Sequence, residues 1–296
     1  MDIGFIGLGN MGAPMVRRLV AAGHNVTGYD IMESAMASLS DVKMNISNDI
    51  LTAASEQEVV ISMLPNGEAL IRVVESILPV MSEGACFIDC STVDISTTRR
   101  VAKLLKDAAI HALDAPVSGG VGGAVAGTLT FMVGGSEASF AIGNPLFKLM
   151  GQRVIHCGID GAGQAAKICN NMILGVTMIA TSEAFALADD LALDRQKLFD
   201  VVSTSSGNSW SMNTYCPAPG IGPKSPSDNN YLPGFSASLM LKDLALSQEA
   251  AAIHGTSTKT GQLALEIYQE FVESGNGGTL DFSAILQDLA SRAKEK

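Results

Sequence analysis

A lysine and an asparagine one helical turn apart are the side chains of this 296-residue sequence best placed to do chemistry. Lys167 follows the glycine turn at 161–163, and Asn171 comes four residues later, so the two share one side of a helix. Nearly every residue from Lys167 to about 191 is apolar or small, which predicts a long buried helix over about 163–191. Lysine is almost never fully buried unless it is paired or functional.

Two roles are open for Lys167. It could donate and accept a proton, or provide a fixed positive charge, beside a reacting alcohol. Free lysine titrates near a pKa of about 10.4, so a base at neutral pH would need a pKa lowered by burial. The structural alternative is a lysine whose head group reaches solvent at a surface between domains. Asn171 would orient the substrate or the ammonium group.

A glycine-rich turn near the start of the chain predicts a dinucleotide-binding site. The spacing Gly7-x-Gly9-x-x-Gly12 follows a short apolar run and opens a helix-forming stretch, as the dinucleotide fingerprint requires. Asp30 ends a second apolar run, where a carboxylate accepts hydrogen bonds from ribose hydroxyls and repels a 2′-phosphate. We therefore predict NAD rather than NADP; the alternative is a coincidental glycine turn with a surface aspartate. The turn residues assigned to the cofactor are Gly7, Leu8, Gly9, Asn10, Met11 and Gly12.

Strand and helix signals alternate through the first half of the chain, with further apolar runs at 59–64 and 85–89. This repetition predicts an α/β fold with a Rossmann-type, doubly wound, mostly parallel sheet that binds ligands at the carboxyl ends of its strands. The residues expected there, along the cofactor's ribose and nicotinamide, are Leu64, Pro65, Asn66 and Thr92. Ordinary turn chemistry is the alternative for each of them.

A second glycine-rich loop follows the strand-like segment 111–116. Ser118, Gly119 and Gly120 begin it, and their small side chains allow successive backbone N–H groups to converge on an anion. In a protein with a net charge of −11, such a nest is a plausible seat for a substrate carboxylate. The alternative is a flexible loop before the next strand.

Beyond about residue 191 the alternation of strands and helices stops, which predicts an all-helical second domain. We expect a NAD-binding Rossmann domain at 1–160 and a helical substrate and oligomerisation domain at 161–296. Trp210 lies in a long loop rich in proline and glycine and is expected to line the substrate pocket. Lys242 either forms a solvated pair with its neighbour Asp243 or reaches the cofactor cleft.

Composition narrows the function classes. The net charge of −11 disfavours nucleic acid, whose binding needs Lys and Arg to neutralise phosphates, and gives no reason to expect a membrane surface. The five cysteines show neither a C-x-x-C pair nor zinc-ligand spacing, so no metal site is expected. Because strand-like sequence begins at Asp2, no signal or transit segment is expected either, which predicts a cytoplasmic protein.

Four ordered signatures resemble the β-hydroxyacid dehydrogenase family over nearly the whole chain. They are the glycine turn at 5–15, Asp114-Ala-Pro-Val-Ser-Gly-Gly120, the run Gly161-x-Gly-x-x-x-Lys167-x-x-x-Asn171, and Lys242-Asp243. Residues 205–217 and the loop after them look like the branch of this family that acts on 3-hydroxyisobutyrate.

The resemblance implies a Rossmann domain, a long interdomain helix and a helical domain that builds a dimer or tetramer. It implies that Lys167 is catalytic, that Asn171 helps to place the substrate, and that residues 118–120 bind its carboxylate. Thr92 would face the nicotinamide end and Lys242 the cofactor cleft.

The reaction that this resemblance implies is the NAD-dependent oxidation of 3-hydroxyisobutyrate to methylmalonate semialdehyde, a step of valine degradation. Another β-hydroxyacid reaction, such as reduction of tartronate or succinic semialdehyde, is the nearest alternative. A non-catalytic dinucleotide sensor is the alternative from a different class.

Overall fold

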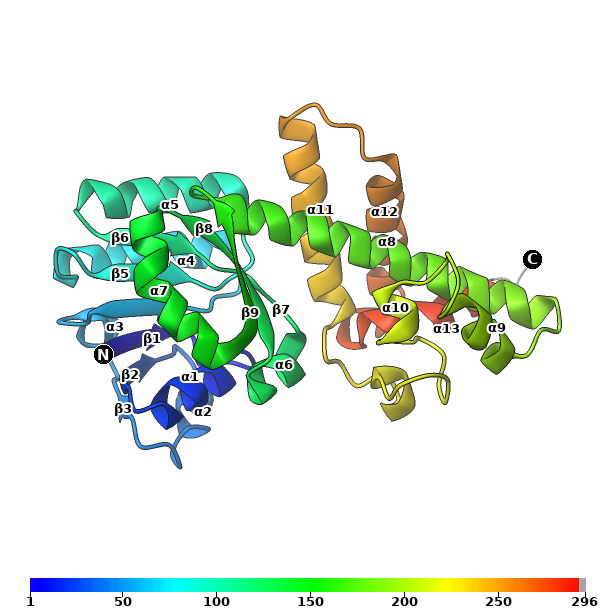
Figure 1. Cartoon of the computed structure of the whole chain (residues 1–296), viewed down its shortest axis with the longest axis horizontal. Helices are drawn as coiled ribbons and strands as arrows, with labels where there is room; N and C mark the ends of the chain where they lie inside the picture. Colours follow the sequence, from blue (N-terminus) through cyan, green and yellow to red (C-terminus); the bar gives the residue numbers. More distant parts are fainter. Residues whose placement is uncertain (293–296) are drawn as a thin grey trace. The chain divides into compact units, whose positions relative to one another are not determined.

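The computed structural model describes residues 1–292 and divides into two compact units, Met1–Lys167 and Ile168–Lys296. A helix of 29 residues, α8 (Ala162–Asp190), links them (Figure 1). The predicted division at 160/161 lies at the start of this helix, whereas the two units meet within its second turn.

The first unit is built on a sheet that has nine strands among the described residues. Its order is β3-β2-β1-β4-β5-β6-β8-β7, with β9 paired to β8. Strands β1 to β6 run parallel, β8 is antiparallel to β6 and β7, and β9 is parallel to β8. The strands are β1 (Asp2–Ile6), β2 (Asn25–Tyr29), β3 (Asn45–Ile46), β4 (Val59–Ser62), β5 (Cys86–Asp89), β6 (His111–Asp114), β7 (Val117–Ser118), β8 (Leu129–Gly135) and β9 (Gly151–Gly158).

Helices cover both faces of this sheet (Figure 1), because the strands are apolar on both sides. Phe5 of β1 belongs to the core cluster under α1 and α7, and its neighbour Ile6 belongs to the cluster under α4 and α5. The mostly parallel, doubly wound fold is therefore confirmed. The helices of this unit are α1 (Gly12–Ala21), α2 (Glu33–Ala37), α3 (Ile50–Ala54), α4 (Gly67–Ile77), α5 (Ile95–Asp107), α6 (Gly120–Ala126) and α7 (Glu137–Met150).

Among its described residues the second unit consists of helices joined by loops, with an isolated β-bridge between Ser236 and Asp281. Its core contains Met178 of α8, Met240 and Leu244 of α11, Tyr268 of α12, and Phe282. The predicted long loop holds a short helix, α10, and a 3₁₀ turn at Pro226–Asn229. Besides α8, the α-helices are α9 (Arg195–Val202), α10 (Trp210–Asn213), α11 (Ala237–Ile253), α12 (Lys259–Glu273) and α13 (Ile285–Arg292).

Helix α8 is not buried all round, contrary to the expectation from its composition. Ile173 is 60% exposed and Leu187 59% exposed in the single chain. By length and mean hydropathy alone α8 could cross a membrane, but the core helix of a soluble protein passes the same test.

Candidate active site

The three glycines of the first turn meet three different spatial demands. A Cβ on Gly7, whose φ is +96°, would lie 2.2 Å from the carbonyl oxygen of Met63. A Cβ on Gly12 would lie 1.9 Å from the carbonyl oxygen of Gly7, so helix and turn are packed against each other. A Cβ on Gly9 would meet nothing within 4 Å. These are the tight turn, the close packing and the open approach that a pyrophosphate needs, so the turn fits a dinucleotide.

Asp30 lies against this turn, directly after β2. Its Oδ2 accepts a hydrogen bond from the backbone N–H of Leu8 at 2.7 Å, and its Oδ1 accepts one from that of Met32 at 2.8 Å. The carboxylate is thus held at the position where the fingerprint places the ribose ligand. A contact to ribose stays a prediction.

The loops after β4 and β5 are joined to each other. The backbone N–H of Leu64 donates to Oγ of Ser91 at 2.8 Å, and Thr92 follows, half-buried. Asn66 caps α4, because its Oδ1 accepts a hydrogen bond from the backbone N–H of Ala69 at 2.9 Å. Ordinary turn chemistry therefore explains the hydrogen bond of the Asn66 oxygen. Pro65, the residue before it, is exposed.

Lys167 is brought to the predicted carboxylate loop. Its Nζ donates to the carbonyl oxygen of Val117 at 2.8 Å, and the side chain is only 6% exposed. Val117 and Ser118 form β7, and Gly119 turns the chain into α6, which begins at Gly120 where a loop was expected; the φ angles of the two glycines are +129° and +61°. Fifty positions of sequence separate Lys167 from Val117, so their contact could not be read from spacing.

Two buried polar side chains fix the first turn of α8, and the sequence analysis did not predict a role for either of them. Asp114 accepts hydrogen bonds from the backbone N–H groups of Gly161 at 2.7 Å and Gln164 at 2.9 Å. The side chain of Gln164 donates to the carbonyl oxygen of Ser91 at 2.8 Å. Burial raises the pKa of Asp114. Asp114 lay within a recognised motif, but a buried glutamine carries no sequence signal.

In the second unit, Asn171 is oriented by a neighbouring carboxylate. It is 1% exposed and donates its Nδ2 to Oδ2 of Asp243 at 2.5 Å. Lys242 lies with Nζ 3.7 Å from Oδ1 of the same carboxylate. The predicted pair of Lys242 and Asp243 is therefore present. Asp243 also accepts the hydrogen bond from Asn171, a contact that was not predicted.

Trp210 stands at the start of α10 and is 48% exposed in the single chain. Its ring stacks on that of Tyr215, with centroids 4.8 Å apart. The hydroxyl of Tyr215 donates to Oδ2 of Asp281 at 2.9 Å. An anchored, partly exposed aromatic surface is suited to contacting a small ligand, and a substrate role for Trp210 stays a prediction.

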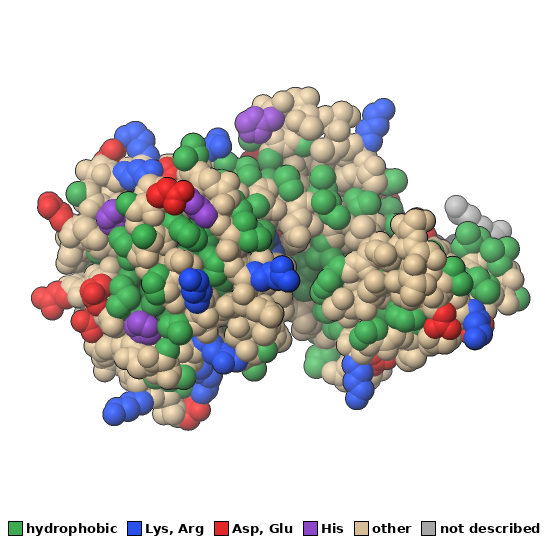
Figure 2. Space-filling view, in the orientation of Figure 1, with side chains coloured by type: hydrophobic (Ala, Val, Ile, Leu, Met, Phe, Trp, Pro, Cys, Tyr) green, Lys and Arg blue, Asp and Glu red, His purple; other side chains and the backbone are tan. Residues whose placement is uncertain are grey.

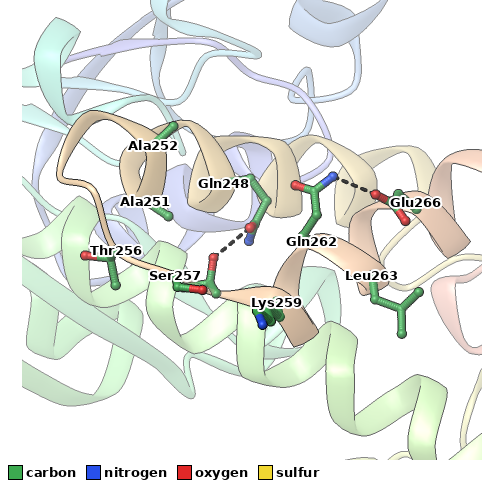
Figure 3. A pocket seen from close by; sticks show the side chains of 10 residues that line it. Gln248, Ala251, Ala252, Thr256, Ser257, Lys259, Gln262, Leu263 and Glu266 are labelled. Carbon is green, nitrogen blue, oxygen red and sulfur yellow. Dashed lines mark hydrogen bonds between the residues drawn. The ribbon is translucent and has the colours of Figure 1, made fainter.

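A separate hollow of about 370 Å³ lies between α11 and α12 (Figure 3). Gln248 accepts a hydrogen bond there from Thr258, and Gln262 donates one to Glu266. None of the predicted site residues lines it, so the hollow is not the candidate active site.

Comparison with known proteins agrees with this geometry. Residues 2–158 match the family model described as the NAD binding domain of 6-phosphogluconate dehydrogenase. Residues 161–289 match the model described as NAD-binding of NADP-dependent 3-hydroxyisobutyrate dehydrogenase. Each half of the chain thus has a counterpart among dinucleotide-dependent dehydrogenases.

Relatives cover nearly the full length. A probable 3-hydroxyisobutyrate dehydrogenase of Mycobacterium tuberculosis is 45% identical over 98% of each chain. The NAD-dependent L-serine dehydrogenase of Pseudomonas aeruginosa is 41% identical over 96% of each. A solved structure of Mycobacterium tuberculosis 3-hydroxyisobutyrate dehydrogenase with L-serine has a TM-score of 0.93 at 45% identity, covering 97% of this chain and 98% of that one. The chain belongs to the 3-hydroxyisobutyrate dehydrogenase family of NAD(P)-dependent oxidoreductases.

Proposed function

We propose that this enzyme oxidises 3-hydroxyisobutyrate to methylmalonate semialdehyde with NAD, as in valine degradation. The observation that carries the proposal is the 2.8 Å hydrogen bond from Nζ of Lys167 to Val117. It holds a buried amino group beside the loop Ser118–Gly120, which would bind the carboxylate of a hydroxyacid. An amino group next to an anion-binding loop suits a substrate that carries both a carboxylate and a reacting hydroxyl group.

The cofactor would be held mainly by the first unit. The open space above Gly9 would receive the pyrophosphate, and Asp30 would accept hydrogen bonds from ribose. When bound, the nicotinamide supplies the acceptor for the hydride that leaves the hydroxyl-bearing carbon. The remaining contacts that we propose for the cofactor come from Gly7, Leu8, Asn10, Met11, Gly12, Leu64, Pro65, Asn66, Thr92 and Lys242.

Lys167 would manage the proton of the substrate hydroxyl group. As a base it takes that proton, and as an ammonium it stabilises negative charge on the same oxygen. Ser118, Gly119 and Gly120 would bind the carboxylate and thereby fix which carbon reacts. Asn171, oriented by Asp243, and Trp210 would contact the rest of the substrate.

L-Serine is a second candidate substrate. It shares the 3-hydroxyacid unit and carries an amino group where 3-hydroxyisobutyrate carries a methyl group. The Pseudomonas aeruginosa relative named for this reaction, and the structure whose title includes L-serine, both favour testing it. Reduction of tartronate or succinic semialdehyde would use the same machinery.

A substrate panel tests these alternatives. We expect kcat/KM with NAD to be higher for 3-hydroxyisobutyrate than for L-serine. It should also be higher than for the hydroxyacids that form when tartronate semialdehyde and succinic semialdehyde are reduced. A higher value for L-serine would replace the proposed substrate but keep the reaction class. Tight NADH binding without turnover of any of them would instead support a dinucleotide sensor.

The preference for NAD should depend on Asp30. In Asp30→Asn the amide oxygen still accepts the N–H of Leu8, but the negative charge that repels a 2′-phosphate is gone. We expect the ratio of kcat/KM for NAD to that for NADP to fall about 10- to 100-fold, the size of one charge-assisted contact. Asp41→Asn, on an exposed carboxylate paired with Arg17, is the matched control and should leave the ratio unchanged. A preference for NADP in the unaltered enzyme would contradict the role of Asp30.

We also propose a homodimer or homotetramer. On the face shown in Figure 2, hydrophobic and uncharged side chains dominate the helical unit. Ile173, Leu187, Ile253 and Leu263 of α8, α11 and α12 are all more than half exposed in one copy. Light scattering after size exclusion should give at least twice the 30.8 kDa chain mass, and Leu263→Asp should lower it. A monomer at micromolar concentration would contradict this proposal.

A cytoplasmic location is part of the same proposal. The net charge of −11 gives no reason to expect binding to an anionic membrane surface. Fractionation of expressing cells should place the dehydrogenase activity in the cytosolic fraction.

A further inference from the structure

Asp89, at the carboxyl end of β5, is buried and collects three hydrogen bonds on one oxygen. Its Oδ1 accepts from the hydroxyl of Ser62 at 2.8 Å, and from the backbone N–H and the hydroxyl of Ser91 at 3.1 and 2.5 Å. Ser62 ends β4 and Ser91 follows β5, so one carboxylate oxygen ties together the ends of two neighbouring strands.

The contact with Ser91 determines how the next hydrogen bond can form. A hydroxyl group has a single proton, and Ser91 gives it to the carboxylate. Its oxygen is thereby presented as the acceptor for the N–H of Leu64 at 2.8 Å. A charged Asp89 therefore fixes the backbone at the start of the loop Leu64–Asn66, in which we propose cofactor contacts.

The same group of contacts reaches the head of α8. Gln164, fully buried, donates to the carbonyl oxygen of Ser91 at 2.8 Å and accepts from the N–H of Val93 at 3.3 Å. These two bonds hold the backbone on both sides of Thr92. Gln164 lies three residues before Lys167 on the same helix, so the loop after β5 and the lysine are positioned by one rigid element.

The second oxygen of Asp89 is left without compensation. Its Oδ2 is buried and has no hydrogen-bond partner among the described residues. Asp89 lines a cavity of about 10 Å³ together with Thr98, Asp114, Asp160 and apolar side chains. That volume is at the lower limit for one water molecule. A buried carboxylate half without a partner lowers stability, and such groups cluster at functional sites.

We propose that Asp89, in its charged form, is a positioning residue that locks both cofactor-binding loops against the head of α8. This inference rests on the proposed dinucleotide site but not on the identity of the hydroxyacid. Asp89 is only 3% exposed, so it would act on the cofactor loops through Ser91, which contacts Leu64 and Gln164, and not by direct contact with a ligand.

The charge on Asp89 gives this role a pH signature. Its pKa is raised from 3.8 to about 6, chiefly by burial and to a smaller extent by the nearby Asp114, although hydrogen bonds from Ser91 and Ser62 lower it. The free energy of unfolding due to Asp89 is therefore highest below pH 3.8 and declines as the pH rises through about 6. Cofactor binding should change in the opposite direction, because it needs the charged carboxylate that forms above pH 6.

Other groups near Asp89 have to be separated from it. Asp114 and Asp160 line the same cavity, and Asp160 pairs with Lys106 of α5. Burial raises the pKa of Asp114 as well, and it raises that of the adjacent Cys90 thiol well above its usual value. Cys90 therefore stays neutral across this range, whereas Asp114 can contribute to the pH response of the unaltered enzyme.

The test compares Asp89→Asn with Asp49→Asn in the full-length enzyme. The amide oxygen at 89 can still accept the same three hydrogen bonds, but without the negative charge each of them is weaker, so Ser91 and Leu64 are held less firmly. Asp49 is an exposed cap of α3, accepting from the N–H groups of Leu51 and Thr52, and provides a matched change far from these loops. NADH affinity by fluorescence, melting temperature, and hydrogen exchange at the Leu64 amide are measured from pH 5 to 8.

In the unaltered enzyme and in Asp49→Asn we expect NADH affinity to fall about tenfold on acidification through pH 6 while the melting temperature rises. Asp89→Asn should bind NADH about tenfold more weakly at pH 8, lose most of the pH response, and exchange the Leu64 amide faster. Affinity and exchange equal to those of Asp49→Asn would overturn the proposal.

A second variant keeps the question answerable if Asp89→Asn does not fold. Ser91→Ala retains the carboxylate but removes the acceptor for Leu64, and it should give the same faster exchange and weaker NADH binding. Unchanged exchange and affinity in Ser91→Ala would also overturn the proposal. Because NADH binding needs no hydroxyacid, failure of the substrate panel leaves this test intact.

Discussion

Replacing Lys167 with alanine should lower kcat about 10²- to 10⁴-fold, the contribution expected of a general acid or base. The amino group is buried, with Nζ 2.8 Å from the carbonyl oxygen of Val117, beside the loop proposed for the carboxylate. The alanine variant loses both possible roles: a neutral amine that accepts the hydroxyl proton, and an ammonium that stabilises charge on the substrate oxygen. NADH affinity, measured by fluorescence, should change by less than about twofold, because the glycine turn that would hold the pyrophosphate is untouched.

Two further variants separate the possible roles of Lys167. Arginine at this position keeps a positive charge but does not release a proton in proteins. Recovery of turnover in Lys167→Arg would indicate an electrostatic role, whereas rescue of Lys167→Ala by small primary amines would indicate proton transfer. Lys103→Ala, an exposed lysine paired with Asp107, is the control for loss of a lysine. Near-normal kcat in Lys167→Ala would exclude Lys167 from the reaction.

The sequence predicted those parts of the fold that depend on local spacing. The glycine turn and the alternating apolar runs gave the Rossmann-type sheet, which is confirmed, and the apolar run after Gly161 gave a helix at about 163–191 against the observed Ala162–Asp190. Such features depend on residues within a few turns of each other. Helix periodicity also placed Lys167 and Asn171 one turn apart without tertiary information.

What was missed depends on contacts between distant segments. Gln164 meets Ser91 across 73 positions and Asn171 meets Asp243 across 72, and neither pair has a spacing rule. The burial of α8 was overestimated. An apolar composition does not distinguish a helix face that packs in the core from one that stays exposed in a single copy of the chain. Asp89 is only the last residue of the apolar run 85–89 in the sequence, whereas its place in the structure depends on donors from two different strand ends.

Gly9→Ala and Gly12→Ala should separate cofactor binding from folding. Neither glycine has a positive φ, so an added methyl group acts through space alone. At Gly12 it would lie 1.9 Å from the carbonyl oxygen of Gly7 and 3.1 Å from the ring of Phe5, so the backbone must move. We expect the free energy of unfolding to drop by about 1–3 kcal/mol, as for overpacking of a core, in denaturant titrations.

At Gly9 the added methyl group would meet nothing within 4 Å, so the free energy of unfolding should change by less than about 1 kcal/mol. The same methyl group would occupy the space through which a pyrophosphate approaches the backbone, and NADH affinity should fall on the order of 100-fold. The two variants differ by three positions and carry the same substitution, so each controls for the other. Full NADH affinity in Gly9→Ala would show that the pyrophosphate does not pass over this turn, and the dinucleotide site would then have to lie elsewhere in the chain.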